Sequence, residues 1–278
     1  MIRLLPLLAL LATPALADPA QRVLTLGGSV TEIAVALGAQ DRLIARDTTS
    51  TFPPEVTSLP DVGYFRALSP EGVLALNPDL ILSEDGAGPP EALDILQAAG
   101  IPFISTGQDT TPEGLIAKIN VVARALDLPE EGKALAARTA AGLAEAKARA
   151  ATVQSPKRVL FVLSLQGGRI MAGGEGSSAE SIIALAGGIN AATGFDGYKQ
   201  ITDEAVIAAA PDVILMMDRE GDLAIANDDV LSHPALSQTP AAKSGAILRM
   251  DGLLLLGFGP RTPQAAAELH ALLYPTTG

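Results

Sequence analysis

The side chains that could bind a metal or act on a substrate are few in this 278-residue sequence, which has no cysteine, two histidines and three tyrosines. Without cysteine there can be no disulfide, thiolate nucleophile, zinc ribbon or iron–sulfur cluster. His233 and His270 give little material for a histidine-rich metal site or for histidine-based catalysis. Aromatic residues make up only 3% of the chain, with three tyrosines, six phenylalanines and no tryptophan, so each tyrosine is a candidate functional residue. Tyr64 and Tyr198 are each followed closely by a cation.

The composition excludes several classes of protein. Hydrophobic residues make up 48% of the chain and charged residues 18%, which is too apolar for a disordered protein. A formal net charge of −12 argues against nucleic acid as a partner. The glycine-rich stretch GGRIMAGGEGSS (Gly167–Ser178) is the only feature that suggests an enzyme, and it matches neither G-x-x-x-x-G-K-[ST] nor a strand–G-x-G-x-x-G–helix context. We therefore predict that the protein is not an enzyme, with a secreted enzyme as the remote alternative.

The first 17 residues, MIRLLPLLALLATPALA, have the features of a secretory signal peptide. Arg3 precedes the apolar stretch Leu4–Leu11, and Ala15–Ala17 supplies the small residues of a cleavage site. The apolar stretch is shorter than the roughly 20 residues that cross a membrane. No cysteine is present at the cleavage site to carry a lipid. We therefore expect a periplasmic protein that is secreted and not lipid-anchored.

The mature chain reads as two α/β lobes, because short β-rich runs alternate with helical patterns. Proline at the start, acids in the first turn and many alanines predict one long helix in the segment 129–154. We expect this helix to lie against both lobes. The predicted organisation is a signal peptide (1–17), an N-terminal lobe (18–128), the linking helix (129–154) and a C-terminal lobe (155–278).

An internal repeat supports the two lobes. LSPEGVLALNPDLILS (Leu68–Ser83) and ITDEAVIAAAPDVILM (Ile201–Met216) align without gaps at an offset of 133, with seven of 16 positions identical. Each predicts a hydroxyl N-cap, a short helix, a Pro-Asp turn and a buried strand, although unrelated αβ units also look alike. Ligands of open α/β sheets bind at the carboxyl ends of strands, so the cleft between the lobes is the expected site. Tyr64 and Tyr198 precede the two repeated helices and would both face that cleft.

Five segments of the mature chain carry distinctive motifs: GGSVTEIAVALGA (27–39), RDTTSTFPPEV (46–56), LPDVGYFRALSPEGVLALNPDLIL (59–82), LAGGINAATGFDGYKQIT (185–202) and GFGPRTPQAA (257–266). These segments resemble the periplasmic haem-binding proteins of ABC haem importers, within the wider class of binding proteins for metal chelates such as vitamin B12 and siderophores. The resemblance covers essentially the whole mature chain and implies a class III periplasmic binding protein, with two Rossmann-like α/β lobes joined by a single long helix. The same fold carrying a ferric siderophore or cobalamin remains the alternative.

The resemblance implies that Tyr64 is the axial ligand of the haem iron, because it occupies the tyrosine of the family's VGY-x-R motif. Because free tyrosine has a pKa near 10, its phenolate needs the iron and a positive neighbour, and Arg66, two residues further on, can supply that charge and a hydrogen bond. Some relatives add a histidine from the second lobe or take two stacked haems, but the corresponding loop here, Ser164–Arg169, has no histidine. We therefore expect one tyrosine ligand and one haem (ferric protoporphyrin IX). The other residues expected in the haem pocket are Ser29, Phe65, Met171, Tyr198 and Arg261, of which Arg261, Tyr198 and Ser29 are candidates to meet the propionates.

Two acidic residues, Glu71 and Glu204, occupy equivalent places in the repeat. The resemblance implies that they dock on arginines of the membrane permease, although an acid in the first turn of a helix is also favourable by itself. The implied partners are haem, an ABC permease dimer with a cytoplasmic ATPase, and an outer-membrane haem receptor system. The carrier itself is expected to be a monomer. Because a single helix joins the lobes, we expect little motion between the empty and loaded forms.

Overall fold

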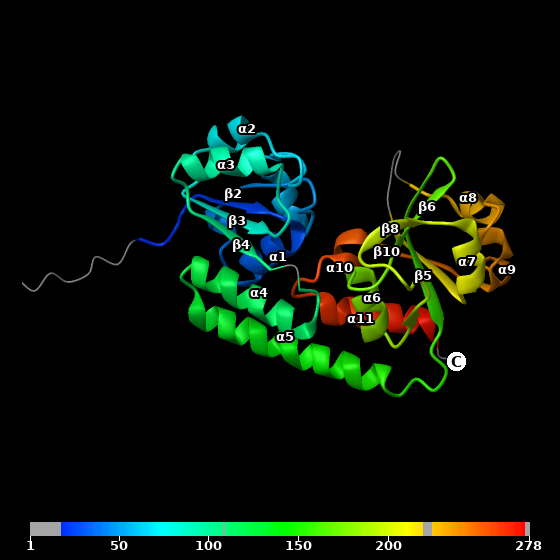
Figure 1. Cartoon of the computed structure of the whole chain (residues 1–278). Helices are drawn as coiled ribbons and strands as arrows, with labels where there is room; N and C mark the ends of the chain where they lie inside the picture. The colour runs from blue at the N-terminus through cyan, green and yellow to red at the C-terminus, as the bar shows by residue number, and fades with distance from the viewer. Residues whose placement is uncertain (1–17, 108, 219–223, 276–278) are drawn as a thin grey trace, which may run out of the picture.

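The structure is a computed structural model that describes residues 18–107, 109–218 and 224–275. The predicted signal peptide, residues 1–17, lies outside these ranges. Two α/β lobes lie side by side, with one long helix running beneath both of them (Figure 1). No helix within the described ranges is long and apolar enough to cross a membrane.

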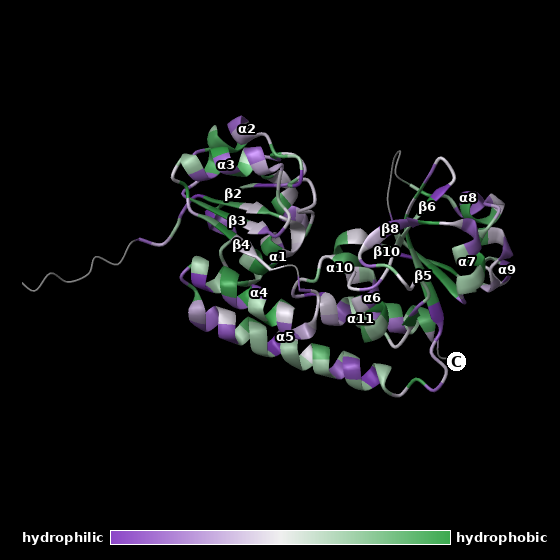
Figure 2. Cartoon of the chain, in the orientation of Figure 1, coloured by the Kyte–Doolittle hydropathy of each residue, from purple (hydrophilic) through white to green (hydrophobic). Residues whose placement is uncertain are grey.

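The N-terminal lobe is a four-stranded parallel sheet in the order β2–β1–β3–β4, with helices on both faces. Successive strand residues point to opposite faces. Val23 and Leu82 therefore pack on one side, and Leu24 and Ile81 on the other. Because both faces are covered, the central strands β1 and β3 are mostly apolar and buried, with polar residues only at Thr25 and at the carboxyl end of β3 (Figure 2). The elements are β1 (Val23–Leu26), α1 (Gly28–Ala36), η1 (Gln40–Arg42), β2 (Leu43–Arg46), η2 (Pro54–Ser58), α2 (Pro70–Leu74), β3 (Leu80–Glu84), α3 (Pro90–Ala98), β4 (Phe103–Thr106) and α4 (Pro112–Ala125).

The predicted linking helix is α5 (Pro129–Ala150), and it packs on both lobes as expected. Leu135 and Leu143 belong to the core of the N-terminal lobe, whereas Ala146, one turn further on, belongs to the core of the C-terminal lobe. Burial of each leucine contributes about 1.5–3 kcal/mol. The helix is therefore attached to both bodies by its apolar face, and the exact lobe boundaries stay a prediction.

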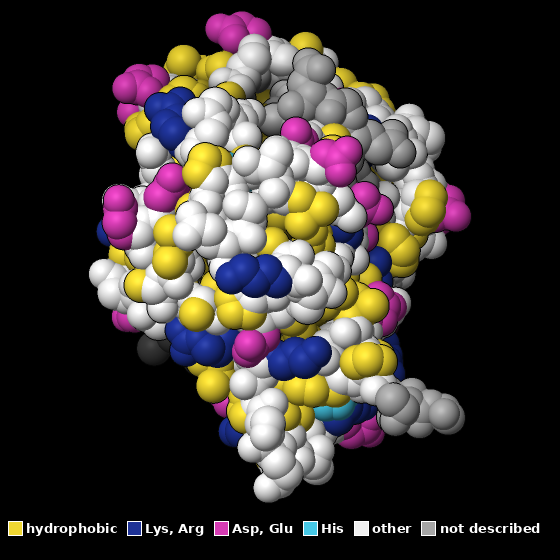
Figure 3. Space-filling model, turned by 90° about the vertical axis from the view of Figure 1, so that its right-hand side faces the viewer, with side chains coloured by type: hydrophobic (Ala, Val, Ile, Leu, Met, Phe, Trp, Pro, Cys, Tyr) yellow, Lys and Arg dark blue, Asp and Glu magenta, His cyan; other side chains and the backbone are white. Residues whose placement is uncertain are grey.

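The C-terminal lobe is a mixed sheet in the order β10–β9–β5–β6–β8, with β7 paired to β5. β10, β9 and β5 are parallel, whereas β6 and β8 run antiparallel to their neighbours. On the outer face of this lobe, apolar side chains are dispersed among charged and polar groups (Figure 3). The elements are β5 (Arg158–Gln166), β6 (Arg169–Gly173), α6 (Ser178–Leu185), β7 (Ile189–Asn190), β8 (Tyr198–Ile201), α7 (Asp203–Ala209), β9 (Val213–Asp218), α8 (Asn227–Ser232), η4 (Leu236–Gln238), α9 (Pro240–Ser244), β10 (Ile247–Asp251), α10 (Gly252–Leu256) and α11 (Thr262–Leu273).

The repeated segments form the same unit in both lobes, and the predicted N-caps are confirmed. The Ser69 hydroxyl accepts the N–H of Gly72 (3.3 Å) at the start of α2. The Thr202 hydroxyl accepts the N–H of Ala205 (3.2 Å) at the start of α7. Each cap satisfies one of the N–H groups that a helix start leaves without a partner.

The Pro-Asp turns tie each repeat to the adjacent central strand. In the N-terminal lobe the Asp79 carboxylate accepts the N–H groups of Gln21 (2.8 Å) and Arg22 (2.9 Å), just before β1. In the C-terminal lobe the Asp212 carboxylate accepts the N–H of Arg158 (2.8 Å) at the start of β5. The aspartate of the repeat thus links its own strand to the neighbouring strand by hydrogen bonds, and both lobes have such an aspartate.

Candidate functional site

A cavity of about 280 Å³ lies between the two lobes. The carboxyl end of β3 and the amino-terminal end of α6 contribute residues to its lining, as expected for an α/β cleft. Two cations and two carboxylates line it, so its charged groups balance. The lining residues are Arg66, Glu84, Asp85, Gly107, Thr110, Lys118, Gly176, Ser177, Ser178, Gly197, Tyr198, Leu256, Gly257 and Phe258.

Tyr64 and Arg66 form a joined pair beside this cavity. Arg66 Nη1 donates a hydrogen bond of 2.6 Å to the Tyr64 hydroxyl. The Tyr64 side chain is 44% exposed, so its oxygen is open to a ligand. Phe65 between them is 2% exposed and packs in the core of the N-terminal lobe, with the Arg66 guanidinium 4.2 Å above its ring. Phe65 was predicted to line the pocket; instead it anchors the turn that presents its two neighbours.

Tyr198 lines the opposite side of the cavity, as predicted. Its hydroxyl lies 2.6 Å from the Ser178 hydroxyl and accepts the N–H of Ala179 (3.3 Å) at the start of α6. Its ring meets Phe161 edge-on. Burial raises the pKa of Tyr198, and the hydrogen bonds together with the charge of Arg66 oppose that shift. Tyr198 therefore offers the cleft a neutral ring whose hydroxyl already has partners.

Ser29 was expected to present a hydroxyl and backbone N–H to an anionic group, and the structure gives it a different partner. It is fully buried, and both its N–H (2.9 Å) and its hydroxyl (2.6 Å) donate to Oε1 of Glu84. The amino-terminal end of α1 is thus already occupied by the protein's own carboxylate. Gly27 makes room for it, since a Cβ there would lie 2.5 Å from the Glu84 side chain.

Arg261 was expected to meet a ligand carboxylate, and it instead forms an ion pair inside the protein. Its Nη2 and Nε donate to the two carboxylate oxygens of Glu32, at 2.5 and 3.1 Å. Its guanidinium also lies 3.5 Å from the centre of the Phe52 ring. Because Glu32 is only 6% exposed and both lie apart from the cavity lining, the fork of Arg261 is already filled.

Lys118 is a cation of the cavity that the sequence reasoning missed. It is 7% exposed, and Nζ donates to the Ser29 hydroxyl (2.9 Å) and to the Phe258 carbonyl (3.2 Å). Burial lowers the pKa of Lys118, and the charge of Glu84 opposes this. The signal was present in the sequence, since Lys118 falls in the apolar stripe of α4 formed by Leu115, Ile119 and Val122.

The remaining predicted residues lie away from the cavity lining. Met171 is half-buried in β6, opposite Ser164 and Gln200 of the neighbouring strands. Glu71 and Glu204 are exposed in the first turns of α2 and α7. Hydrogen bonds from its own backbone and from Thr202 lower the pKa of Glu204. The Glu71 carboxylate likewise accepts a hydrogen bond from the Ser69 hydroxyl (3.1 Å). Both glutamates are therefore exposed carboxylates at equivalent places, and each is hydrogen-bonded to the N-cap hydroxyl of its own helix.

Both histidines have backbone partners outside the cavity lining. His233 Nε2 lies 3.0 Å from the Gly168 carbonyl, and His270 Nδ1 lies 3.0 Å from the Ala186 carbonyl. Across the described ranges, no group of three or more His, Cys, Asp and Glu side chains is arranged to hold a metal ion.

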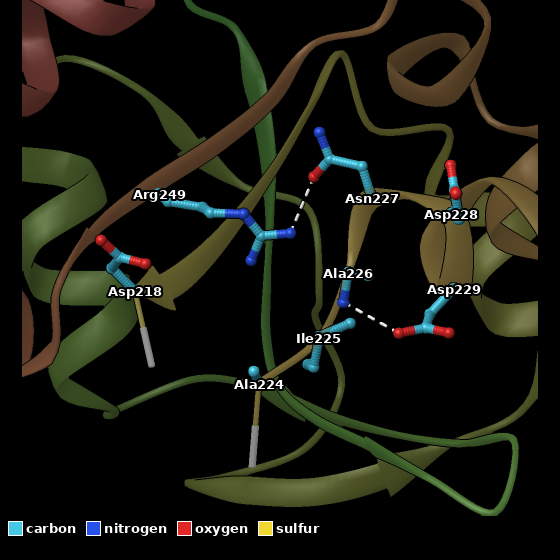
Figure 4. A pocket seen from close by; sticks show the side chains of 8 residues that line it. All are labelled: Asp218, Ala224, Ile225, Ala226, Asn227, Asp228, Asp229 and Arg249. Atoms are coloured by element: carbon cyan, nitrogen blue, oxygen red, sulfur yellow. Dashed lines mark hydrogen bonds between the residues drawn. The ribbon is translucent and has the colours of Figure 1, made fainter. Parts of the chain in front are cut away.

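A second hollow, of about 540 Å³, lies in the C-terminal lobe (Figure 4). Arg249 reaches across it and donates to Asn227 Oδ1 (2.7 Å), while the Asp229 carboxylate accepts the N–H of Ala226 (2.8 Å). Residues 219–223, between two of its lining residues, lie outside the described ranges. We assign this hollow no role.

Two α/β lobes, a joining helix and one cleft between them define a substrate-binding protein. Residues 23–253 match the family described as "Periplasmic binding protein", and the chain belongs to that family.

Among solved structures, the chain is similar to the periplasmic heme-binding protein RhuT from Roseiflexus sp. RS-1 in apo form. The identity is 39% and the TM-score 0.87, over 92% of this chain and 98% of that one. It is also similar to the periplasmic heme-binding protein BhuT in complex with two hemes, at 40% identity and a TM-score of 0.85, over 91% and 97% of the chains. Among curated relatives, the vitamin B12-binding protein of Vibrio cholerae serotype O1 (strain ATCC 39315 / El Tor Inaba N16961) is 30% identical over 230 residues, which are 81% of this chain and 80% of the relative.

These comparisons confirm the resemblance and the predicted fold class, and they place the chain among periplasmic binding proteins whose named members bind heme or vitamin B12. The similar proteins are substrate-binding proteins of transport, not enzymes. The prediction that the chain is not an enzyme is therefore confirmed.

Proposed function

We propose that this protein captures ferric haem in the cleft between its lobes and delivers it to an ABC permease. The observation that carries the proposal is the pair of Tyr64 and Arg66, in which an accessible phenol oxygen accepts a hydrogen bond from a guanidinium. As a phenolate, Tyr64 is the axial ligand of the iron, and Arg66 stabilises its negative charge. The ring of Tyr198 packs against the macrocycle from the opposite wall.

Cobalamin is the second candidate, because curated relatives are named for vitamin B12. A ferric siderophore is the third candidate. Haem is favoured over both because a tyrosine with an adjacent arginine supplies an anionic oxygen to an iron that has an open axial position, which an already coordinated cobalt or siderophore iron does not require. The heme-binding proteins BhuT and RhuT are also more similar in sequence, at 40 and 39% identity, than the vitamin B12-binding protein of Vibrio cholerae, at 30%.

Titration of the purified mature chain with hemin, cyanocobalamin and a ferric siderophore tests the proposal. We expect a Soret band characteristic of phenolate ligation, and no binding of the other two. Tyr64→Phe should shift this band and weaken hemin binding by at least about 100-fold. Tyr274→Phe is the matched control, since Tyr274 bonds Lys157 and Gly187 away from the cavity lining. An unchanged spectrum and affinity in Tyr64→Phe would contradict the assignment.

We propose one haem per chain, although the similar protein BhuT was solved with two hemes. The reason is that one accessible phenol with a cation is available, whereas the Tyr198 hydroxyl is held by Ser178 and Ala179. The same titration measures this, because the break in the Soret absorbance should fall at one equivalent of hemin. A break at two equivalents would show a second site.

We propose that Glu71 and Glu204 dock the loaded carrier on arginines of the permease dimer, which a cytoplasmic ATPase drives. Both carboxylates are exposed and occupy equivalent places in the two lobes. Glu71→Ala/Glu204→Ala should lower haem uptake by a reconstituted permease while leaving hemin affinity unchanged. Glu91→Ala is the matched control, since Glu91 is an exposed first-turn acid of α3. Uptake equal to that of the control would remove this role.

The cellular setting follows from the same proposal. The mature chain begins after the signal peptide of residues 1–17, is released without a lipid anchor, and works as a periplasmic monomer. It receives haem that an outer-membrane receptor system has admitted. Mass spectrometry of the exported protein and its elution volume on a sizing column would check the cleavage, the missing lipid and the oligomeric state.

A further inference from the structure

The segment that follows α10 crosses from the C-terminal lobe to the N-terminal lobe at the base of the cleft. Arg261 is enclosed there by two residues of the N-terminal lobe, Glu32 on one side and Phe52 on the other. The guanidinium donates to both carboxylate oxygens of Glu32. Both side chains of this ion pair are largely buried, at 19 and 5% exposed. Arg261, a cation of the C-terminal segment, is therefore bound by residues of the N-terminal lobe.

A second cation, Lys118 of the N-terminal lobe, makes a hydrogen bond in the opposite direction, to the C-terminal lobe. Lys118 of α4 donates to the carbonyl of Phe258, three residues before Arg261. Its other acceptor is the Ser29 hydroxyl, which in turn donates to Glu84. The Lys118 ammonium is thus connected to the Glu84 carboxylate through the Ser29 hydroxyl. The same ammonium also binds the C-terminal segment at Phe258.

The backbones approach closely where these two contacts are made. A Cβ added at Gly259 would lie 3.1 Å from the Glu32 carboxylate and 3.5 Å from the Cα of Ser29. A Cβ at Gly28 would lie 2.3 Å from Leu253 of α10. Phe258 itself has a φ of 48°, which is unusual for a residue other than glycine. The segment is therefore shaped to fit against α1.

These contacts add to the connection that α5 provides. A helix that joins two bodies along one line leaves them free to twist about it, whereas separate contacts at other points do not. Lys118 and Arg261 supply two such points, and the hydroxyls of Thr110 and Ser181, 3.0 Å apart, join the lobes at a third. Separating the lobes would break the Arg261–Glu32 ion pair and remove the Phe258 carbonyl from Lys118, which would keep only the Ser29 hydroxyl of its own lobe. The loss of a largely buried, doubly hydrogen-bonded ion pair is unfavourable.

We propose that Lys118 and Arg261 are positioning residues that clasp the two lobes at the base of the cleft and fix the distance between its Tyr64 and Tyr198 walls. Arg261 lies outside the cavity lining, and the ammonium of Lys118, although it lines the cavity, is bonded to Ser29 and Phe258. Their proposed role is to hold the lobes together. The assignment explains why neither is free to meet a propionate, since Arg261 is occupied by Glu32 and Lys118 by Phe258 and Ser29. It does not depend on which ligand the cleft takes.

Pulsed electron–electron double resonance, which measures the distance between two spin labels, tests on the ligand-free protein whether Lys118 and Arg261 hold the lobes together. The chain has no cysteine, so spin labels can be attached at Ile95→Cys in α3 and Leu231→Cys in α8, which are 48 and 43% exposed and lie in different lobes. In Lys118→Met/Arg261→Met we expect the distribution of label distances to broaden about two-fold, with the far-ultraviolet circular dichroism unchanged. Lys133→Met is the matched control, because it removes an ion pair with Glu130 that is exposed on α5.

A distribution in the double variant as narrow as that of the parent would overturn the clasp, and so would equal broadening in Lys133→Met. If the double variant does not fold, Lys118→Met and Glu32→Gln are measured singly. Broadening in either one supports the clasp, and parental widths in both overturn it. Because no ligand is added, the result is independent of whether hemin binds.

Discussion

The two walls of the cleft each carry a tyrosine, and the surroundings of the two phenols differ. Tyr64, on the N-terminal wall, is 44% exposed and has a guanidinium on its oxygen. Tyr198, on the C-terminal wall, is mostly buried, and its oxygen is held by Ser178 and the N–H of Ala179. The same side chain is therefore prepared for ligation on one wall and for packing on the other. Residue type alone does not decide the role; the partners of the oxygen do.

Replacing the cation beside each tyrosine should show the largest difference between the walls. Arg66→Met removes the donor to Tyr64, and we expect hemin affinity to fall about 10–100-fold with a shift of the Soret band. Lys199→Met, next to Tyr198, should change affinity by less than about two-fold, because Lys199 is exposed and lies outside the cavity lining. Hemin titrations of both variants make the comparison. Equal losses would mean that the walls contribute alike.

The strand-linking aspartates of the repeat, Asp79 and Asp212, should show a smaller difference. It concerns how much each one contributes to the free energy of unfolding. Asp79 accepts two backbone N–H groups and Asp212 accepts one, because the N–H of Lys157 goes to the Tyr274 hydroxyl instead. We expect Asp79→Ala to lower the free energy of unfolding by about 2 kcal/mol and Asp212→Ala by about 1 kcal/mol. Urea denaturation measures both. A larger loss for Asp212→Ala would contradict this count of partners.

Glu32, where the lobes meet, should make stability depend on pH. Burial raises its pKa above the usual 4.5, Arg261 opposes this shift, and Asp251 and Glu84 add to it. The folded protein thus keeps a proton on Glu32 at pH values where the unfolded chain has lost it. This contribution to stability is complete at acidic pH and is lost as the pH rises through the folded pKa.

We therefore expect the free energy of unfolding of the wild type, relative to Glu32→Gln, to fall as the pH rises above 4.5. The slope should not exceed about 1.4 kcal/mol per pH unit. Chemical denaturation of both proteins between acidic and neutral pH gives the difference directly. A difference that is constant or that grows with pH would show that Glu32 is not the group responsible.

The smallest effect should come from the hydroxyl of the C-terminal wall. Tyr198→Phe keeps the ring but leaves Ser178 and the N–H of Ala179 without this partner, which should cost about 1 kcal/mol of stability. Hemin affinity and the Soret maximum should stay close to those of the wild type. A loss of affinity as large as that in Tyr64→Phe would make Tyr198 a second ligand and remove the contrast between the walls.

Much of the fold could be predicted from the sequence, because its signals are local. Ser69 and Thr202 mark helix starts, Pro129 starts the linking helix, and the repeat identifies two related lobes. Strands β2 and β8 were not predicted, since their half-exposed sequences depend on pairing with distant neighbours. Phe65 was misplaced because the turn sends it inward between two outward residues.

The Tyr64 wall of the cleft could be predicted in part from the sequence, whereas the contacts at the base of the cleft could not. The pairing of Tyr64 with Arg66 spans two residues and was anticipated. Ser29 meets Glu84 across 55 residues, and Arg261 meets Glu32 across 229. No local pattern links such partners. The one available signal was a charge within an apolar helical stripe, as at Lys118.

The order of these residues along the chain has a consequence for synthesis. Glu32 and Lys118 are made early, and their partners Arg261 and Phe258 come close to the C-terminal end. Until that end emerges, the first lobe carries a carboxylate and an ammonium whose C-terminal partners do not yet exist. A chain that stops after α10 would contain the strands of both sheets and the joining helix in its sequence but would lack both Phe258 and Arg261. The last part of the molecule to be made thus determines how its two earlier parts face each other.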